Sequence, residues 1–217
     1  MDSEQVLALL KGLGRPEYLE GMKRFGIDTS CALGVKIPEL RGLAKKAGKD
    51  HALALALWET GVHEARILAS MVDDPASVTP RQIERWAGEF SSWDLCDQVC
   101  GNLFDRTPHW LRYAVKFATR KPEMVRRAGF VLMAESAVHR TAEPDEVFAA
   151  FFPLIEEGAG DERNYVKKAV SWALRQIGKR SQPLRTEAIR CAERIGAQES
   201  APARWIARDA LRELQKS

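Results

Sequence analysis

The stretch Asn164–Lys179, NYVKKAVSWALRQIGK, decides the fold class. Its apolar residues recur at intervals of three and four, which is the spacing of the buried face of an α-helix. That buried face is predicted to comprise Val166, Ala169, Val170, Ala173 and Ile177. A second face, here called the aromatic-basic face, has the same spacing and comprises Tyr165, Lys168, Trp172, Arg175 and Lys179. Cations attract phosphates and flat rings contact sugars or bases, so this face suits a polyanion.

The same helical pattern extends along most of the chain, with prolines at the expected helix starts. Thr79-Pro80, Thr107-Pro108 and Ser200 before Pro202 each place a capping hydroxyl near a proline that fits a first helical turn. The alternating Ala and Leu of His51–Trp58 predict a buried helix. No segment has the pattern of a strand. We therefore predict an all-α protein, in which further helices open at Pro16, Pro38, Pro122 and Pro144.

A weak internal repeat indicates how these helices are organised. Arg127-Ala128 recurs as Lys168-Ala169, and Trp172–Arg175 recurs as Asp209–Arg212. Intervals of roughly 40 residues are typical of helical hairpins that stack into a curved solenoid. The interval from Asp97 to Arg127 is shorter, so we expect an irregular array. Residues 1–217 are predicted to form a single domain, in which equivalent helices line one concave side.

The composition is that of a folded soluble protein, with 45% hydrophobic and 29% charged residues. The formal net charge of +3 is too small to indicate nucleic-acid binding by itself. Zinc-ligand spacing is absent from the four cysteines, which we expect to be reduced core residues. With no secretion signal or membrane-spanning run, we expect a cytoplasmic protein without a metal or cofactor. The cysteines are Cys31, Cys96, Cys100 and Cys191.

The segment Trp93–Gly101 contains the first candidate for chemistry. Asp94 follows Ser91 by three residues, which predicts a capping box. Asp97 lies nearly one turn deeper and shares a face with Trp93, without a basic residue four positions later in its helix. Such a carboxylate is either one partner of an interhelical ion pair, with Arg127 as the candidate partner, or a catalytic group.

The other candidates also have two interpretations. Arg127 has the spacing of a residue at the edge of the core, with its head group reaching solvent. Trp93 and Trp172 are of the type that anchors packing in helical repeats, although Trp172 belongs to the aromatic-basic face. A basic row near the C-terminus either contacts a polyanion or is a solvated face. This row comprises Arg204, Arg208 and Arg212.

Three segments carry a family resemblance. Trp93–Asp97 (WDLCD), Arg126–Ala128 (RRA) and Val166–Arg175 (VKKAVSWALR), in this order, resemble the bacterial DNA alkylation repair glycosylases of the AlkD family, which are built from HEAT-like repeats. Leu33–Arg41 is similar to the start of that family's N-terminal helix. The resemblance extends from about Phe25 to the last helix. It implies an irregular HEAT-like helical-repeat solenoid that holds duplex DNA in a concave basic groove.

The resemblance also implies an activity, the excision of positively charged N3- and N7-alkylated purines by hydrolysis of the N-glycosidic bond, without flipping the base into a pocket. It makes Asp97 the catalytic carboxylate. It assigns substrate binding to Trp93, Trp172, Arg127 and Phe25, where Phe25 replaces an expected tyrosine. Lys36 replaces an expected glutamine and adds phosphate attraction. We expect DNA-backbone contacts from Lys36, Tyr165, Lys168, Arg175, Lys179, Arg204, Arg208 and Arg212.

The implied chemistry agrees with these residue types. A cationic alkylpurine is already a good leaving group, so no general acid is required. A carboxylate stabilises the oxocarbenium-like sugar and orients water, and indole faces attract its cationic character. The expected partner is double-stranded DNA containing alkylated bases, bound by a monomer without a membrane or protein partner. Two alternatives stay open: a catalytically silent HEAT-repeat DNA-binding protein, and a solenoid that binds an acidic protein.

Overall fold

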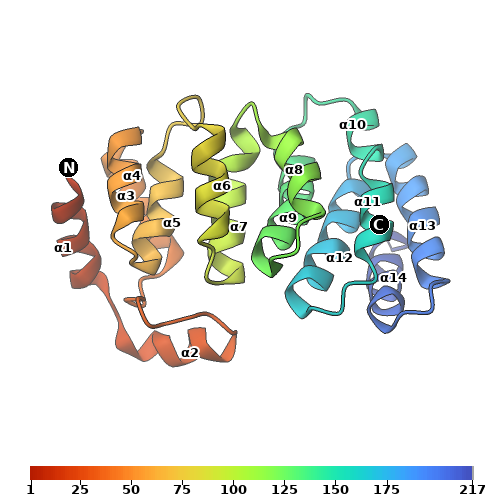
Figure 1. Cartoon of the computed structure of the whole chain (residues 1–217), viewed down its shortest axis with the longest axis horizontal. Coiled ribbons are helices and arrows are strands. Elements are labelled where there is room, and N and C mark those ends of the chain that lie inside the picture. The colour runs from red at the N-terminus through yellow and green to blue at the C-terminus, as the bar shows by residue number, and fades with distance from the viewer. Residues whose placement is uncertain (217) are drawn as a thin grey trace. The chain divides into compact units, whose positions relative to one another are not determined.

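The computed structural model describes residues 1–216, and these residues form helices and connecting loops without a β-strand (Figure 1). The all-α prediction is confirmed. The helices are α1 (Ser3–Leu13), η1 (Pro16–Tyr18), α2 (Leu19–Arg24), α3 (Ile37–Ala47), α4 (His51–Glu59), α5 (His63–Val72), α6 (Pro80–Gly88), α7 (Trp93–Asn102), η2 (Phe104–Arg106), α8 (Trp110–Ala118), α9 (Glu123–His139), α10 (Asp145–Ala149), α11 (Phe152–Gly158), α12 (Asn164–Gly178), α13 (Gln182–Gly196) and α14 (Ala201–Leu214).

The helices group into two compact units, Met1–Pro108 and the part from His109 onward. In the first unit, α5 packs on α3, α4 and α7. The core of this unit contains Trp58 of α4 and Trp86 of α6, whose rings stack with centroids 4.0 Å apart and an interplanar angle of 3°. Both indoles are buried. His51–Trp58 therefore forms the predicted buried helix, and its aromatic end anchors the unit.

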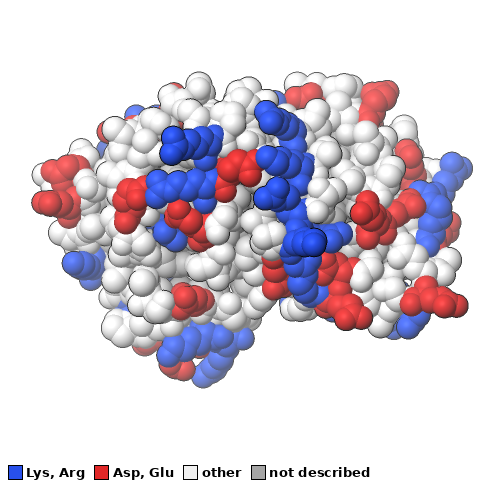
Figure 2. All heavy atoms as spheres, viewed as in Figure 1, with Lys and Arg blue, Asp and Glu red and all other residues white. Residues whose placement is uncertain are grey.

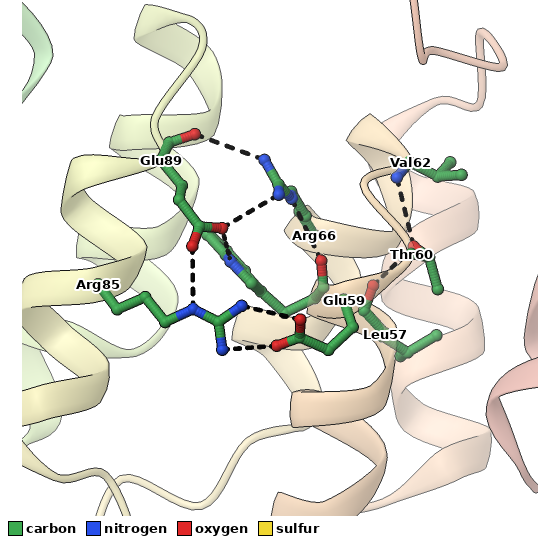
Figure 3. A network of polar contacts seen from close by, with 8 residues as sticks. Leu57, Glu59, Thr60, Val62, Arg66, Arg85 and Glu89 are labelled. Atoms are coloured by element: carbon green, nitrogen blue, oxygen red, sulfur yellow. Dashed lines mark hydrogen bonds and ion pairs between the residues drawn. The ribbon is translucent and has the colours of Figure 1, made fainter.

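A polar network covers the edge of this indole stack (Figure 3). One oxygen of the Glu89 carboxylate accepts hydrogen bonds from Trp58 Nε1 at 2.7 Å and Arg66 Nη2 at 3.1 Å, and the other accepts from Arg85 Nε at 2.9 Å. Arg85 also pairs with Glu59 at 2.7 Å. The network connects α4, α5 and α6, so these three helices are joined by polar contacts as well as by apolar packing.

The second unit contains three helical hairpins, α8–α9, α11–α12 and α13–α14. Helix α9 packs on α12, and α12 packs on α14. Arg127, Lys168 and Trp205 are each the fifth residue of their helix, in α9, α12 and α14 respectively. The recurrence of Arg127-Ala128 as Lys168-Ala169 therefore joins equivalent positions of successive hairpins.

Two glycines allow close helix packing in this unit. A Cβ atom at Gly129 of α9 would lie 2.2 Å from the backbone nitrogen of Ala118, at the end of α8. A Cβ atom at Gly158 would lie 2.4 Å from the ring of Phe130. Any larger side chain at these positions would push neighbouring helices apart, because the cores of proteins are close-packed.

The helix starts agree with most of the predicted signals. Thr79 caps α6 by accepting a hydrogen bond from Gln82 N, and Ser200 caps α14 by accepting one from Ala203 N. The start predicted at Thr107-Pro108 is wrong. Thr107 Oγ1 donates to Phe104 O at 2.9 Å and so closes η2, whereas α8 begins at Trp110. Pro38 lies in the first turn of α3 and Pro16 opens η1, while Pro122 and Pro144 directly precede α9 and α10.

The cysteine prediction is correct for three residues and wrong for one. Cys96, Cys100 and Cys191 are buried, but Cys31 is exposed. It lies in the connection between α2 and α3, where its backbone carbonyl accepts a hydrogen bond from His63 N at 2.9 Å. Within residues 1–216, no cluster of His, Cys, Asp and Glu is suited to a metal ion. The helices of the same range are too short or too polar to cross a bilayer.

Candidate nucleic-acid interface

Trp93 and Asp97 are one helical turn apart on α7, outside its buried face. Leu95, Cys96 and Val99 face the core, whereas Trp93 and Asp97 are both half-buried. The carboxylate of Asp97 is thus on a side of the helix that solvent reaches in part. Both residues belong to the first unit, so their spacing along one helix face follows directly from the α-helical geometry of this segment.

A long-range hydrogen bond holds Trp93. Its indole Nε1 donates to the backbone oxygen of Phe25 at 2.8 Å. Phe25 ends α2, and its own side chain is 70% exposed. The structure therefore brings Phe25 and Trp93 together, through the main chain of one and the side chain of the other, and leaves the Phe25 ring accessible to a ligand.

The segment before α3, which carries Lys36, is held by a buried carboxylate. Glu64 is 1% exposed and accepts hydrogen bonds from the backbone nitrogens of residues 33, 34 and 35, the shortest being 2.7 Å from Gly34. Gly34 has a φ of +78°, and a Cβ atom there would lie 2.3 Å from Arg15 O. Lys36 follows this cradle and is exposed, with its Nζ 4.5 Å from the centre of the Tyr18 ring.

A pair of the buried His63 and the half-buried Asp94 links α5 to the first turn of α7. His63 Nε2 lies 2.8 Å from Asp94 Oδ2, and Ser92 Oγ donates to Asp94 Oδ1 at 2.6 Å. Burial alone lowers the pKa of His63, but the hydrogen bond and negative charge of Asp94 outweigh burial and raise it. Burial alone raises the pKa of Asp94, but its bonds to His63 and Ser92 lower it. The pair is therefore stabilised in its charged form.

This pair corrects one prediction and adds two residues to the site. The capping box of Ser91 and Asp94 is absent, because Ser92 is the residue that precedes α7 and Asp94 is bonded to His63. The sequence did contain a signal for His63. It stands four residues before Ile67, on the face of α5 that is buried, where a histidine needs a polar partner.

A cavity of about 400 Å³ adjoins the pair. Lys36, His63 and Asp94 contribute to its wall, and most of the remaining wall is apolar. Lys36 and the start of α7 therefore border the same cavity. The first unit brings together Lys36, Phe25 and Trp93, three of the residues that the resemblance assigns to DNA and substrate contacts.

In the second unit, Arg127 joins α9 to α12. It is 5% exposed, and its Nη1 donates to the backbone oxygen of Tyr165 at 2.6 Å. The prediction that its head group reaches solvent from the core edge is wrong, since the guanidinium is bonded within the unit. Arg127 thus fixes the position of the first turn of α12, which carries Tyr165 and Lys168.

Helix α12 has the buried face that its sequence predicts. Val166, Ala169, Val170, Ala173 and Ile177 are all fully buried. On the aromatic-basic face the side chains are accessible to different degrees: Tyr165, Trp172 and Arg175 are half-buried, whereas Lys168 and Lys179 are exposed. The face is therefore present as a surface of α12.

Acidic residues of α14 neutralise part of the aromatic-basic face. Arg175 forms an ion pair with Glu213 and approaches Asp209 at 3.4 Å, and Lys179 pairs with the same Glu213. These contacts outweigh partial burial and lower the pKa of Glu213. Lys168, by contrast, forms no ion pair with any residue in the range 1–216. The free positive charge of this face is consequently concentrated near Lys168.

The basic row of α14 contains both paired and unpaired arginines. Arg212 pairs with Asp209 at 2.8 Å. Arg204 and Arg208 are exposed, form no ion pair in the part of the chain that the structure describes, and line a groove of about 650 Å³ between α13 and α14. Glu193 is the acidic residue of this groove. The two free arginines therefore border α13, whereas Asp209 and Glu213 contact α12.

Comparisons with known proteins give a consistent result. Residues 6–214 match the family model described as DNA alkylation repair enzyme. An uncharacterized protein of Listeria innocua is 22% identical over 197 residues, which cover 89% of this chain and 86% of that protein. A solved structure described as a new family related to the HEAT-like repeat DNA glycosylases, with affinity for branched DNA structures, superposes with a TM-score of 0.80. It is 20% identical and covers 99% of this chain and 96% of its own, so the fold is HEAT-like.

Proposed function

This chain belongs to the DNA alkylation repair enzyme family, and we propose that within this family it is a DNA glycosylase for positively charged N3- and N7-alkylated purines. One observation carries this proposal. Helix α7 presents Trp93 and Asp97 together on a face that solvent reaches, and the Trp93 indole is fixed by its bond to Phe25 O. A fixed aromatic ring next to a carboxylate is the combination that a cationic sugar requires.

The proposed mechanism uses Asp97 as the electrostatic group. As the bond between the alkylpurine and C1′ breaks, positive charge develops on the sugar, and the Asp97 carboxylate stabilises it and orients the attacking water. The departing base carries its own positive charge and becomes neutral when it leaves with the bonding electrons. Water supplies the hydroxyl group at C1′ and releases a proton, for which a carboxylate or bulk water is a sufficient acceptor.

The remaining residues position the DNA. We assign the indole faces of Trp93 and Trp172 to the deoxyribose of the lesion, and Phe25 to the lesion itself. Lys36 contacts the nearby phosphates, together with the free cations Lys168, Arg204 and Arg208. Arg127, which is buried and bonded to Tyr165 O, positions the start of α12 for these contacts. The exposed ring of Phe25 and the half-buried ring of Trp172 support these assignments, because a ring must be accessible to contact a sugar or base.

Replacement of Asp97 by Asn tests this proposal. We expect Asp97→Asn to bind a duplex with one 7-methylguanine as the wild type does, and to release the base slower by about 10² or more, because one key charge is lost. Alkaline cleavage of the abasic site in single-turnover reactions measures the rate. Asp2→Asn is a matched control, because Asn also caps a helix and Asp2 caps α1 far from α7. Unchanged release by Asp97→Asn would exclude Asp97 from the mechanism.

A second candidate function is binding of branched DNA without excision. The structural neighbour with affinity for branched DNA supports it. The same assay separates the two functions. A wild-type protein that binds a four-way junction but forms no abasic site on any methylated duplex is a binding protein, and Asp97→Asn would then change nothing.

A further inference from the structure

The segment that contains α8 is unusually basic. Residues 109–122 include Arg112, Lys116, Arg120 and Lys121 but no Asp or Glu, in a chain with 30 acidic residues. These four cations were not among the predicted DNA contacts, because α8 does not carry any of the motifs of the family. Figure 2 shows Lys and Arg side chains gathered in a column over the part of the molecule where Figure 1 places α8.

Two of these cations lie on α8, and the other two directly follow it. Arg112 and Lys116 are one turn apart on α8, whereas Arg120 and Lys121 lie in the loop after Ala118, where the helix ends. We call these four residues the α8 basic segment. The opposite side of α8 is buried through Tyr113, Ala114 and Phe117. Arg112 and Arg120 are exposed, and so are Leu111 at 41% and Val115 at 43%.

Three charges of the α8 basic segment are available to a ligand. Arg112, Arg120 and Lys121 form no ion pair with another residue among those that the structure describes. The neighbouring Arg126 and Arg163, in contrast, both pair with Asp161. Arg163 also donates to the backbone oxygen of Lys121 at 2.6 Å and so holds the end of the α8 basic segment in place. Arg112, Arg120 and Lys121 therefore supply free positive charge, and the backbone at Lys121 is fixed.

Arg112 and Lys116 are on a different helix from the DNA contacts that the sequence predicts in the second unit. Those contacts are on α9, α12 and α14, whereas α8 is the other helix of the α8–α9 hairpin. Helix α9 packs on α8 as well as on α12. A ligand on the exposed side of α8 therefore binds a surface that the contacts on α12 and α14 do not include.

We propose that the α8 basic segment, with Arg112 and Lys116 on α8 and Arg120 and Lys121 directly after it, is a second DNA-contact surface that binds the phosphates of a further duplex arm. The inference rests on the proposed DNA binding. Phosphates of one strand recur every 3.4 Å along a duplex axis, so a duplex arm presents several of them to a group of four cations. An acidic protein helix is the competing ligand, and it would bury Leu111 and Val115. A linear duplex would occupy only one of the two surfaces, whereas a branched DNA could place one arm on the predicted contacts and another on the second surface.

Charge reversal on α8 tests the inference. We expect Arg112→Glu with Arg120→Glu to weaken binding of a four-way junction about tenfold or more at 0.1 M salt, and to lower the salt slope of log K by about 2. Excision of 7-methylguanine from a short linear duplex stays at the wild-type rate. Leu111→Ala with Val115→Ala is the matched control on the same helix and leaves junction binding unchanged. Fluorescence anisotropy measures binding, and circular dichroism confirms the helical content of each variant.

The other outcomes decide against the second surface. If charge reversal leaves junction binding unchanged, the second surface is overturned. It is also overturned if the Leu111 and Val115 changes reduce junction binding, because that result indicates a protein-binding face. An equal loss of junction binding and duplex excision places α8 in the single duplex site and overturns it as well. If the wild type excises no base and binds no DNA, the proposed function fails first. If it excises normally but binds junction and duplex equally, only the second surface fails.

Discussion

Two adjacent residues at the start of α5 hold both segments that carry the site residues of the first unit. Glu64 binds the backbone of residues 33–35 before Lys36, and His63 binds Asp94 next to Trp93. Hydrogen bonds to a charged group stabilise a protein by about 1.5 to 3 kcal/mol each, and leaving buried N–H groups without an acceptor costs a similar amount. These two side chains therefore support the site without contacting a substrate.

His63 makes the stability of the first unit dependent on pH. Its pKa in the folded protein is above the ordinary value of 6.5, so the protonated ring contributes its full stabilisation below pH 6.5. That contribution is lost as the pH rises through the pKa of the folded state. The pKa of Asp94 is below its ordinary value of 3.8, so its carboxylate stays ionised in this range.

We expect His63→Gln to be less stable than the wild type, with the largest difference below pH 6.5 and a smaller one in alkaline solution. Glutamine keeps a hydrogen-bond donor near Asp94 but carries no charge at any pH. Urea unfolding at a series of pH values between about 5.5 and 9 measures the difference. A difference that is constant over this range would show that the charge of His63 makes no contribution to the folded state.

At the scale of elements, the packing of α8 on α9 depends on the absence of a side chain at Gly129. Gly129→Ala places a methyl group against the backbone of Ala118, which cannot move away as a flexible side chain would. We expect a loss of about 1 to 3 kcal/mol in the free energy of unfolding. Gly42 of α3 is a matched control, because a Cβ atom there meets nothing within 4 Å.

Chemical denaturation of both glycine variants checks this prediction. Gly42→Ala is expected to be neutral or to stabilise by about 0.5 to 1 kcal/mol, since alanine is the better helix former. If Gly129→Ala were as stable as Gly42→Ala, the distance between α8 and α9 in solution would have to be larger than the structure gives.

The contact between α12 and α14 limits the charge of the aromatic-basic face. Glu213 binds both Arg175 and Lys179, so its replacement by Gln releases Lys179 and leaves Arg175 with its contact to Asp209 alone, without removing the hydrogen-bonding side chain. If this face binds DNA, Glu213→Gln is expected to strengthen duplex binding at low salt and to steepen the salt slope by about 1. Titration of a labelled duplex at several salt concentrations measures both effects. Weaker binding would mean that Glu213 positions Arg175 for its contact and does not compete with DNA.

At the scale of the whole molecule, the class of fold could be predicted because its determinants are local. Apolar residues at intervals of three and four specify α12 and its buried face, and hydroxyl groups before prolines specify the starts of α6 and α14. The repeat of Arg127-Ala128 as Lys168-Ala169 identified equivalent hairpins. Each of these signals depends on a few neighbouring residues, so the sequence reveals it directly.

The parts of the candidate site that could not be predicted depend on contacts between distant residues. Asp94 has a cap-like spacing from Ser91, but its partner is His63, from another helix. Arg175 and Lys179 have the spacing of a basic face, but the acidic residues that neutralise them belong to the next hairpin. Sequence spacing describes one helix at a time, whereas the partners of Asp94, Arg175 and Lys179 are on other helices.

The bond from the Trp93 indole to Phe25 O has a consequence for how this protein can evolve. A main-chain oxygen is present whatever amino acid occupies position 25, so the anchor tolerates any replacement that keeps the backbone path. The exposed side chain at that position is not required for the anchor. Under the proposed function, mutation can therefore vary this side chain and change which lesions it contacts. The tyrosine expected from the family resemblance and the phenylalanine found here would both leave this hydrogen bond to Trp93 in place.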